Sequence, residues 1–234
     1  MTTENIYQSI KKWKSLIDSY KNGNNAIEAE ILGYLNQGTH FSVSGDEVRQ
    51  WQNILGKEEQ KRIHAYIGID ENVLKFFLID SKSDKEGNFN TIFIKEFTRQ
   101  SPNAITENTP NLEICPPITS ESAINRNFRW NMYGSIWLKA QKVEPFVQII
   151  SIPFADYERL GLEGKQSCTC FFGLTNDIQK SVSGFTYHIE IITVKDLTIN
   201  EMSKTAENYS TPRPPFTVDA PADYQLLLKS GAYL

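Results

Sequence analysis

Apolar residues at the start of the chain follow the spacing of one face of an α-helix. They recur at alternating gaps of four and three residues, which places them on a single stripe. Thr2 or Thr3 is predicted to cap this helix, and Asn22-Gly23-Asn24 to end it. The stripe consists of Ile6, Ile10, Trp13, Ile17 and Tyr20.

Two further helices and a short strand are predicted before residue 60. The first of these helices has Asn25 as its cap and Gly38 just past its end, and residues 40–44 then alternate as a strand. Ser44-Gly45-Asp46-Glu47 has the pattern of a capping box, which predicts the start of another helix. The predicted inward-facing residues are Ile27, Ile31 and Leu35 in the earlier helix and Val48, Trp51 and Leu55 in the later one.

A β-hairpin is predicted next. Residues 62–69 and 73–80 are predicted as strands, and Asp70-Glu71-Asn72 between them is typical of a tight turn. Residues 73–80 are apolar at nearly every position, which predicts a central strand covered on both faces. A polar loop at 81–90 and a further strand at 91–99 complete the first half.

The second half is predicted to begin after a connector. Residues 100–119 contain four prolines and show no periodicity. A helix resumes near Ser120, with Trp130 and Trp137 close to an apolar side made of Ile124, Phe128, Met132 and Ile136. Then come a strand at 146–152, a short helix at 156–160, strands at 167–174 and 185–194, and a proline-bearing tail at 211–216 that leads to Leu226, Leu227 and Leu228.

The two halves repeat the order helix, strand, short helix, strand, strand. Residues 43–48 match residues 152–157 at an offset of 109, residues 65–69 match residues 170–174 at 105, and the opening helices match at 118. These matches indicate a duplicated unit, with chance resemblance as the alternative because few residues are identical. A duplication predicts an α+β fold with two similar α-β-α-β-β units packed as a pseudo-twofold duplicated domain. Its sheets are expected to be largely antiparallel, with helices on one face and a cleft where the sheets meet.

This organisation divides the chain into four parts. They are a first α+β unit at 1–100, a proline-rich connector at 101–119, a second α+β unit at 120–200, and a C-terminal strap at 201–234 that packs on the domain. Gly68 and Gly173 lie at matched strand positions, where glycine indicates a bulge or a close approach of another backbone.

Charge and apolar content exclude several classes of protein. The net charge is −4, and the densest basic group, Lys11, Lys12 and Lys14, is typical of a solvated helix face rather than of a nucleic-acid stripe. No apolar run approaches the roughly 20 residues that cross a bilayer. The N-terminus also lacks the basic start and apolar stretch of an export signal, which favours the cytoplasm.

Signatures of common enzymes are missing from the sequence. It has no Gly-x-Gly-x-x-Gly, Walker loop or Gly-x-Ser-x-Gly motif, and none of His40, His64 and His188 lies beside an obvious nucleophile. Cys168 and Cys170 share one strand face. Without a second pair of soft ligands, they are predicted to be small buried hydrophobes rather than metal ligands.

Short motifs in the second half resemble a loose group of uncharacterised bacterial cytoplasmic proteins. The motifs are Ile152-Pro153 with Asp156, then Phe171-Phe172-Gly173-Leu174, then Pro214-Pro215-Phe216. That group carries tryptophan-bearing helices before an Ile-Pro-x-x-Asp segment and has no assigned activity. The resemblance therefore implies a bacterial cytoplasmic origin and no mechanism.

The order of elements is also similar to the paired modules of the vicinal oxygen chelate superfamily. Those enzymes hold a divalent metal between modules, on ligands from the first and last strands of each. The resemblance implies His40, Glu96, Gln148 and Glu190 as ligands here, and all four are chemically suitable. The opening helix of each half departs from that pattern, and the second half is one strand short.

Aromatic residues make up 12% of the chain, while catalytic constellations are missing. This combination favours a non-catalytic binding or assembly module that presents a groove to another protein. It predicts a protein partner, no cofactor, and no binding to nucleic acid or membrane, and it is compatible with a homo-oligomer. The alternative is a metal-dependent enzyme of vicinal oxygen chelate type with a divalent ion between the two units, and a third hypothesis is a self-assembling structural subunit. The sequence does not decide whether the chain is an enzyme.

Overall fold

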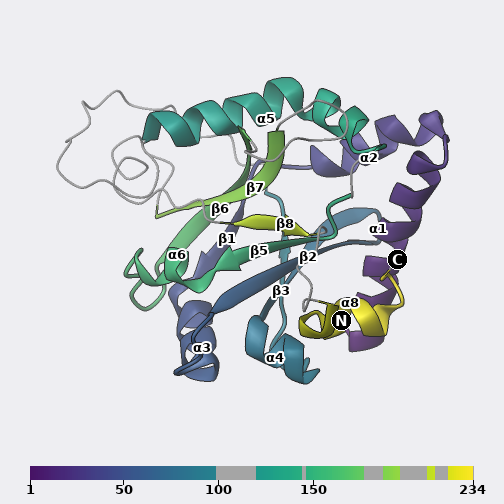
Figure 1. Cartoon of the computed structure of the whole chain (residues 1–234). Coiled ribbons are helices and arrows are strands. Elements are labelled where there is room, and N and C mark those ends of the chain that lie inside the picture. Colours follow the sequence, from purple (N-terminus) through teal and green to yellow (C-terminus); the bar gives the residue numbers. More distant parts are fainter. Residues whose placement is uncertain (99–119, 144–145, 177–186, 196–209, 214–220, 234) are drawn as a thin grey trace.

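The computed structural model describes residues 1–98, 120–143, 146–176, 187–195, 210–213 and 221–233 (Figure 1). The connector predicted at 101–119 lies wholly outside these residues. In chain order the elements are α1 (Thr3–Lys21), a 3-10 turn (Asn25–Ile27), α2 (Glu28–Leu35), β1 (Phe41–Ser44), α3 (Gly45–Leu55), β2 (Arg62–Asp70), β3 (Val73–Asp80), α4 (Ser81–Glu86), β4 (Phe93–Glu96), α5 (Ser120–Ala140), β5 (Ile149–Pro153), α6 (Phe154–Glu158), β6 (Ser167–Asn176), β7 (Tyr187–Val194), β8 (Thr211–Arg213), a second 3-10 turn (Pro221–Asp223) and α8 (Gln225–Ser230).

Helix α1 has the start and the buried face that the sequence predicts. The Thr2 hydroxyl oxygen accepts a hydrogen bond from the backbone N–H of Asn5 at 3.3 Å, which satisfies one of the free donors of the first turn. All five residues of the predicted stripe are buried. The indole N–H of Trp13 donates to the carbonyl of Val147 at 3.2 Å, so α1 is also fixed to the second half of the chain.

Helix α2 begins later than predicted. The 3-10 turn comes first, and the residue that precedes α2 is Ile27, whose side chain makes no capping hydrogen bond. Asn25 is therefore not the cap of an α-helix. Ile31 and Leu35 are buried as predicted, whereas Ile27 is only half-buried.

The predicted capping box and hairpin turn are both confirmed. The backbone N–H of Ser44 donates to the Glu47 carboxylate at 2.7 Å, and the Glu47 N–H donates back to the Ser44 hydroxyl oxygen at 3.3 Å. Between β2 and β3, Glu71 and Asn72 adopt left-handed φ angles of 47° and 64°. Two successive left-handed residues match the twist of the flanking strands and fix the register of the hairpin.

The polar loop predicted at 81–90 is wrong in its first part, because residues 81–86 form helix α4. The Asp80 carboxylate accepts from the Ser83 N–H at 2.8 Å and caps the helix, which ends at Gly87 with a φ of 69°. Asp84 in this helix is completely buried. The six residues of α4 contain no apolar side chain, so periodicity gives no signal for it.

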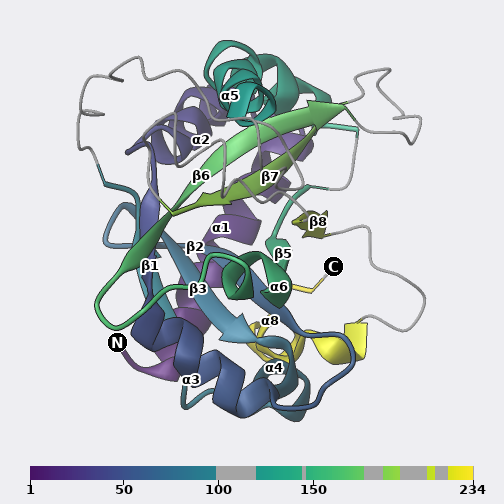
Figure 2. The ribbon, with the colours of Figure 1, turned by 90° about the vertical axis from the view of Figure 1, so that its left-hand side faces the viewer.

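Within the described ranges every strand pair is antiparallel, and the strands form two sheets. One sheet has the order β1-β6-β7, and the other has the order β4-β3-β2-β5-β8. Each sheet combines the two halves of the chain, since β1 pairs with β6 and β5 pairs with β2. Figure 2 shows β6 and β7 running beneath α5, at the opposite end of the molecule from α3 and α4.

The two exchanged strand pairs have the same register. Val43 lies opposite Cys168 in the β1–β6 pair, and Ile152 lies opposite Ile63 in the β5–β2 pair. The sequence offset of 109 relates Val43 to Ile152, and the offset of 105 relates Ile63 to Cys168. Residues related by the two offsets therefore lie opposite each other in the same way in both strand pairs. Each half places its first strand against a strand of the other half.

An offset of 117, rather than the predicted 118, aligns buried positions of the two opening helices. An offset of 118 would set the buried Ile10 on Phe128, which is 57% exposed. An offset of 117 instead aligns buried residues of α1 with buried residues of α5. The apolar side that the sequence shows in α5 faces outward, so an offset of 118 aligns the inner side of α1 with the outer side of α5. The matched buried pairs are Ile6 with Ala123, Trp13 with Trp130, and Tyr20 with Trp137.

The two sheets pack on one shared core and approach each other at both edges. At one edge the Thr98 N–H donates to the carbonyl of His40 at 2.7 Å, next to β1. At the other edge the N–H of Ile191 in β7 donates to the hydroxyl of Ser210 at 2.7 Å, just before β8. The core between the sheets contains buried side chains from both halves, among them Phe41, Phe76 and Phe172. Among the described residues, the predicted cleft between the sheets is thus a packed interior.

Helices α1 and α5 cover the outer faces of β2 and β6, and α8 packs against α1. The predicted close approach of another backbone is confirmed at Gly68, whereas the atoms nearest to Gly173 belong to side chains. A Cβ atom at Gly68 would lie 2.9 Å from the carbonyl carbon of Ser9, and one at Gly173 would lie 3.2 Å from the Cβ of Arg126. No helix within the described ranges has the length and apolarity to span a membrane.

Candidate functional site

The first two residues proposed as metal ligands lie near one edge of the sheets and bond to other groups. His40 places Nδ1 2.9 Å from the Thr39 hydroxyl and Nε2 3.0 Å from the Thr98 hydroxyl, so both ring nitrogens are in use. Glu96 is on the surface, with its side chain 51% exposed, and forms an ion pair with Lys75 at 3.2 Å. Neither residue holds its donor atoms ready for a cation.

The other two proposed ligands are buried and hold the fold together. Gln148 donates through Nε2 to the carbonyl of Ala232 at 3.3 Å. Both carboxylate oxygens of Glu190 accept from the Arg126 guanidinium at 3.1 Å, which fixes α5 to β7. In the part of the chain that the structure describes, no group of three or more His, Cys, Asp or Glu side chains could hold a metal ion. The metal centre stays a prediction, and these contacts do not support it.

A buried polar cluster lies between β2, α4 and α8. The Asp84 carboxylate accepts from His64 Nδ1 at 2.7 Å, from the Tyr66 hydroxyl, and from the backbone N–H of Leu226 at 2.9 Å. Burial, reinforced by the Asp84 charge, raises the pKa of Tyr66 well above its ordinary value of 10, so Tyr66 stays a neutral donor. The cluster anchors the C-terminal helix.

The His64–Asp84 pair has the composition of a catalytic dyad but not its access. The His64 side chain is 2% exposed, and its ring lies 4.5 Å from the ring of Tyr224, measured between centroids. A general base must reach its substrate within hydrogen-bond distance. His64 is therefore hydrogen-bonded inside the fold and out of reach of a substrate at the surface.

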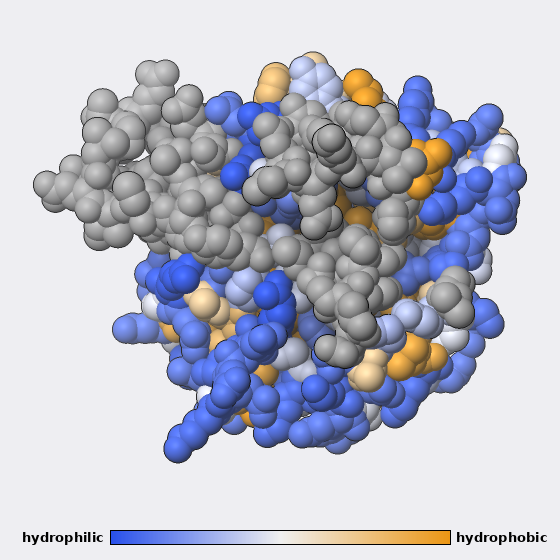
Figure 3. Space-filling model, viewed as in Figure 1, coloured by the Kyte–Doolittle hydropathy of each residue, from blue (hydrophilic) through white to orange (hydrophobic). Residues whose placement is uncertain are grey.

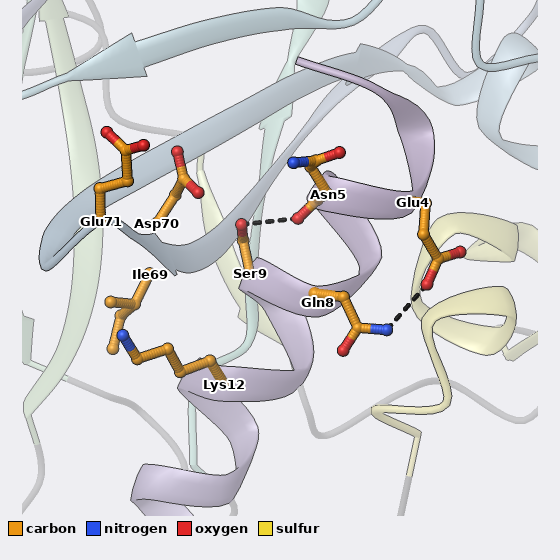
Figure 4. Close-up of a pocket in the computed structure, with 8 residues that line it drawn as sticks. All are labelled: Glu4, Asn5, Gln8, Ser9, Lys12, Ile69, Asp70 and Glu71. Carbon is orange, nitrogen blue, oxygen red and sulfur yellow. Dashed lines mark hydrogen bonds between the residues drawn. The ribbon is translucent and has the colours of Figure 1, made fainter.

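An open pocket of about 410 Å³ lies between the first turns of α1 and the tip of the β2–β3 hairpin (Figure 4). Two of its three carboxylates are bonded within the protein. Glu4 accepts from the Gln8 amide at 2.7 Å, and Asp70 accepts from Lys75 Nζ at 2.8 Å. Because these groups already have partners, they would do little to orient a ligand.

A row of apolar side chains runs along the outer side of α5. Ile124, Phe128, Met132 and Ile136 are spaced by four residues, and we call these four residues the α5 stripe. Their exposed fractions are 36%, 57%, 56% and 49%, and Tyr133 beside them is 40% exposed. Figure 3 shows apolar residues along the upper edge of the molecule, where α5 lies in Figure 1.

The exposed fractions give the approximate area of this surface. At about 200 Å² for a fully exposed large side chain, the stripe and Tyr133 together expose on the order of 500 Å². This area lies within the range of roughly 300–600 Å² that is typical of the largest apolar patch on a monomer, and such patches are often functional.

The inner side of α5 fixes which way the stripe faces. Trp130 and Trp137 are buried with their rings 5.5 Å apart, and Trp130 packs against Phe172 at 5.0 Å. The Asn127 side-chain amide donates to the carbonyl of Phe172 at 2.8 Å. The sequence placed the stripe residues together on one side but did not say which side of α5 faces the sheet. The two tryptophans were the signal for the true inner side, because tryptophan is highly buried on average.

Helix α1 provides an internal comparison for α5. It covers β2 as α5 covers β6, and the offset of 117 relates the outer sides of the two helices. The related positions are Lys11 and Phe128, Ser15 and Met132, and Ser19 and Ile136. In α1, Lys11 and Ser15 are exposed and Ser19 is half-buried. Covering a sheet therefore does not require an apolar outer side, and the apolar side of α5 needs another explanation.

No protein-family model, curated protein or solved structure matches this chain. The resemblances to a bacterial group and to vicinal oxygen chelate modules therefore stay predictions. Among the surfaces of the described residues, the outer side of α5 is the candidate functional site.

Proposed function

We propose that this chain is a non-catalytic assembly module that presents the outer side of α5 to another protein. The observation that carries the proposal is the α5 stripe, because three of its four residues are apolar where α1 has Lys11, Ser15 and Ser19. The fourth, Ile124, corresponds to the half-buried Tyr7. Burial of apolar surface contributes about 25 cal/mol per Å². A patch on the order of 500 Å² therefore offers roughly 12 kcal/mol of gross stabilisation to a partner before the costs of association.

The scaffold beneath α5 is proposed to be two copies of one α-β-α-β-β unit that exchange their first strands. Support comes from the shared register of the β1–β6 and β5–β2 pairs and from the matched buried residues of α1 and α5. In this proposal α5, the opening helix of the second half, has diverged from α1 on its outer side. The binding surface is then a convex helix side rather than the groove expected between the sheets.

The test of the proposal uses a photoreactive residue on the stripe. Benzoylphenylalanine in place of Phe128 keeps an aromatic ring at an exposed position, so the fold is retained. We expect a covalent adduct of defined mass with one protein in cells that produce the chain at its natural level. The adduct should disappear when Met132→Ser and Ile136→Ser are added, because they remove neighbouring apolar contacts.

The matched control places benzoylphenylalanine at Lys11, the position of α1 that corresponds to Phe128. Because the outer side of α1 is polar, this variant should give no adduct of defined mass. Adducts of equal yield from both positions would mean that α5 has no special role, and the assembly proposal would then be wrong. The assembly proposal would also be wrong if the two added serines left the yield of the adduct at position 128 unchanged.

A further inference from the structure

We infer that the protein bound by the α5 stripe is a second copy of this chain, related by a twofold axis that passes α5 at the level of Trp130. The two α5 helices run antiparallel in this dimer. The inference rests on the proposed function and specifies its partner.

The order of side chains in the stripe is self-complementary. Read in either direction, it has isoleucine at both ends and two larger flexible or aromatic residues between them. A twofold contact requires that residue i meets residue j and that j meets i. Antiparallel copies centred on residue 130 set Phe128 level with Met132 of the second copy and Ile124 level with its Ile136.

Helix geometry agrees with this contact. Residues spaced by four form an inclined ridge, and two such ridges interdigitate at a crossing angle of about −50°. Near the centre of the stripe, Asn125, Asn131 and Ser135 are exposed and uncharged, and the half-buried Arg129 is the charged residue nearest to the axis. With a rise of about 1.5 Å per residue, the two copies of Lys139 lie about 27 Å apart along the helix direction, beyond the reach of strong repulsion.

The area of the stripe sets the expected strength of the dimer. On the order of 500 Å² per copy falls below the roughly 800 Å² per partner of a standard stable interface. The dimer should therefore dissociate at micromolar concentration, and a single measurement at low concentration would miss it.

Sedimentation velocity of the purified chain tests the inference over a range of about 1 to 500 µM. We expect the mass to rise from 26.7 kDa toward twice that value as concentration increases. The variant Phe128→Lys, Met132→Ser, Ile136→Ser carries the α1 residues on α5 and should stay at 26.7 kDa throughout. Gln52→Lys on the exposed side of α3 adds the same charge and should dimerise like the wild type. An unchanged unfolding temperature will show that the triple variant is folded.

Disulfide trapping tests the antiparallel register. Phe128→Cys and Met132→Cys chains are mixed and oxidised. Each also carries Cys115→Ser, so that the buried Cys168 and Cys170 are the only native cysteines left in the sequence. We expect the mixed 128–132 disulfide to exceed either like-with-like disulfide several-fold. Predominant 128–128 and 132–132 disulfides would overturn the antiparallel arrangement.

A wild-type mass of one chain at every concentration would overturn the second copy as partner. In that case an adduct between position 128 and a different protein would leave the proposed function standing. A single-chain mass with no adduct of defined mass would contradict both.

Discussion

The backbone N–H of Gly45 donates to the carbonyl of Gln166 at 2.8 Å, which joins the first residue of α3 to the segment before β6. The N–H of Phe154 donates to the carbonyl of Lys61 at 3.0 Å, which joins the first residue of α6 to the segment before β2. The offsets of 109 and 105 relate these two hydrogen bonds, as they relate the registers of the strand pairs. The first strand of each half is thus seated on the other half in the same way.

The reciprocal pairing predicts that the halves fold only together. Fragments 1–100 and 101–234, produced separately, should each lack cooperative thermal unfolding, because β1 and β5 lose the strands with which they pair. Mixed or co-produced fragments should form a one-to-one complex that unfolds in a single transition, measured by circular dichroism. A fragment 1–100 that unfolds cooperatively by itself would contradict the prediction.

Alanine at the two strand glycines should have unequal costs. A Cβ at Gly68 would lie 2.7 Å from the ring of Phe77 and 2.9 Å from the backbone of Ser9, so helix α1 itself would have to move. A Cβ at Gly173 would lie 2.7 Å from the tip of the flexible Ile192 side chain. Overpacking costs about 1–3 kcal/mol.

We therefore expect Gly68→Ala to lower the free energy of unfolding by about 3 kcal/mol and Gly173→Ala by about 1 kcal/mol. Urea titrations of both variants measure the two values side by side. Equal losses, or a larger loss at Gly173, would contradict the expected difference between the two sites.

Local patterns along the chain predict most of the helices and strands, but they do not predict which strands pair with each other. The stripe of α1, the capping box of α3 and the β2–β3 turn depend on nearby residues, so the sequence predicts them. The pairing of β1 with β6 joins strands more than a hundred residues apart, and nothing in either strand specifies the other.

The helix α5 shows why the candidate site could not be predicted. Its inner side is marked by Trp130 and Trp137, while the more regular apolar spacing belongs to its outer side. Periodicity shows that residues share a side of a helix, but it does not say whether that side meets the core or a partner. The packing of Trp130 on Phe172 and the hydrogen bond from Asn127 to the Phe172 carbonyl settle the orientation.

Substitution of two glutamates separates the assembly module from a metal enzyme. Glu190 is 1% exposed and paired with Arg126, so Glu190→Gln should lower the free energy of unfolding by about 2 kcal/mol. Glu96→Gln, at a side chain that is 51% exposed, should change it by less than about 0.5 kcal/mol. Elemental analysis of both variants and the wild type completes the comparison. A stoichiometric divalent ion that both substitutions remove would favour the metal enzyme.

Stability at mildly acidic pH should depend on His40. Burial lowers the pKa of His40 from its ordinary value of 6.5. The unfolded chain therefore takes up a proton near pH 6.5 that the folded chain does not, and the free energy of unfolding falls as pH drops below that value. The contribution is fully present above pH 6.5 and is lost below it.

The variant His40→Gln keeps a polar group at this position but does not titrate. We expect the stability advantage of the wild type over the variant to be smaller at about pH 5.5 than at about pH 7.5. Thermal unfolding at both pH values measures it. An advantage that is equal at both would mean that His40 titrates alike in the folded and unfolded chain.

Oxidation of two methionines tests the central claim in its specific form, that the outer side of α5 meets a second copy of this chain. Met132 in the stripe is 56% exposed and Met1 is 51% exposed, so the two side chains are matched in access within one molecule. Hydroxyl-radical labelling followed by mass spectrometry should oxidise both at similar rates in dilute protein. At concentrations where the dimer forms, we expect the rate at Met132 to fall several-fold while the rate at Met1 stays constant. A ratio of the two rates that is independent of concentration would contradict the account.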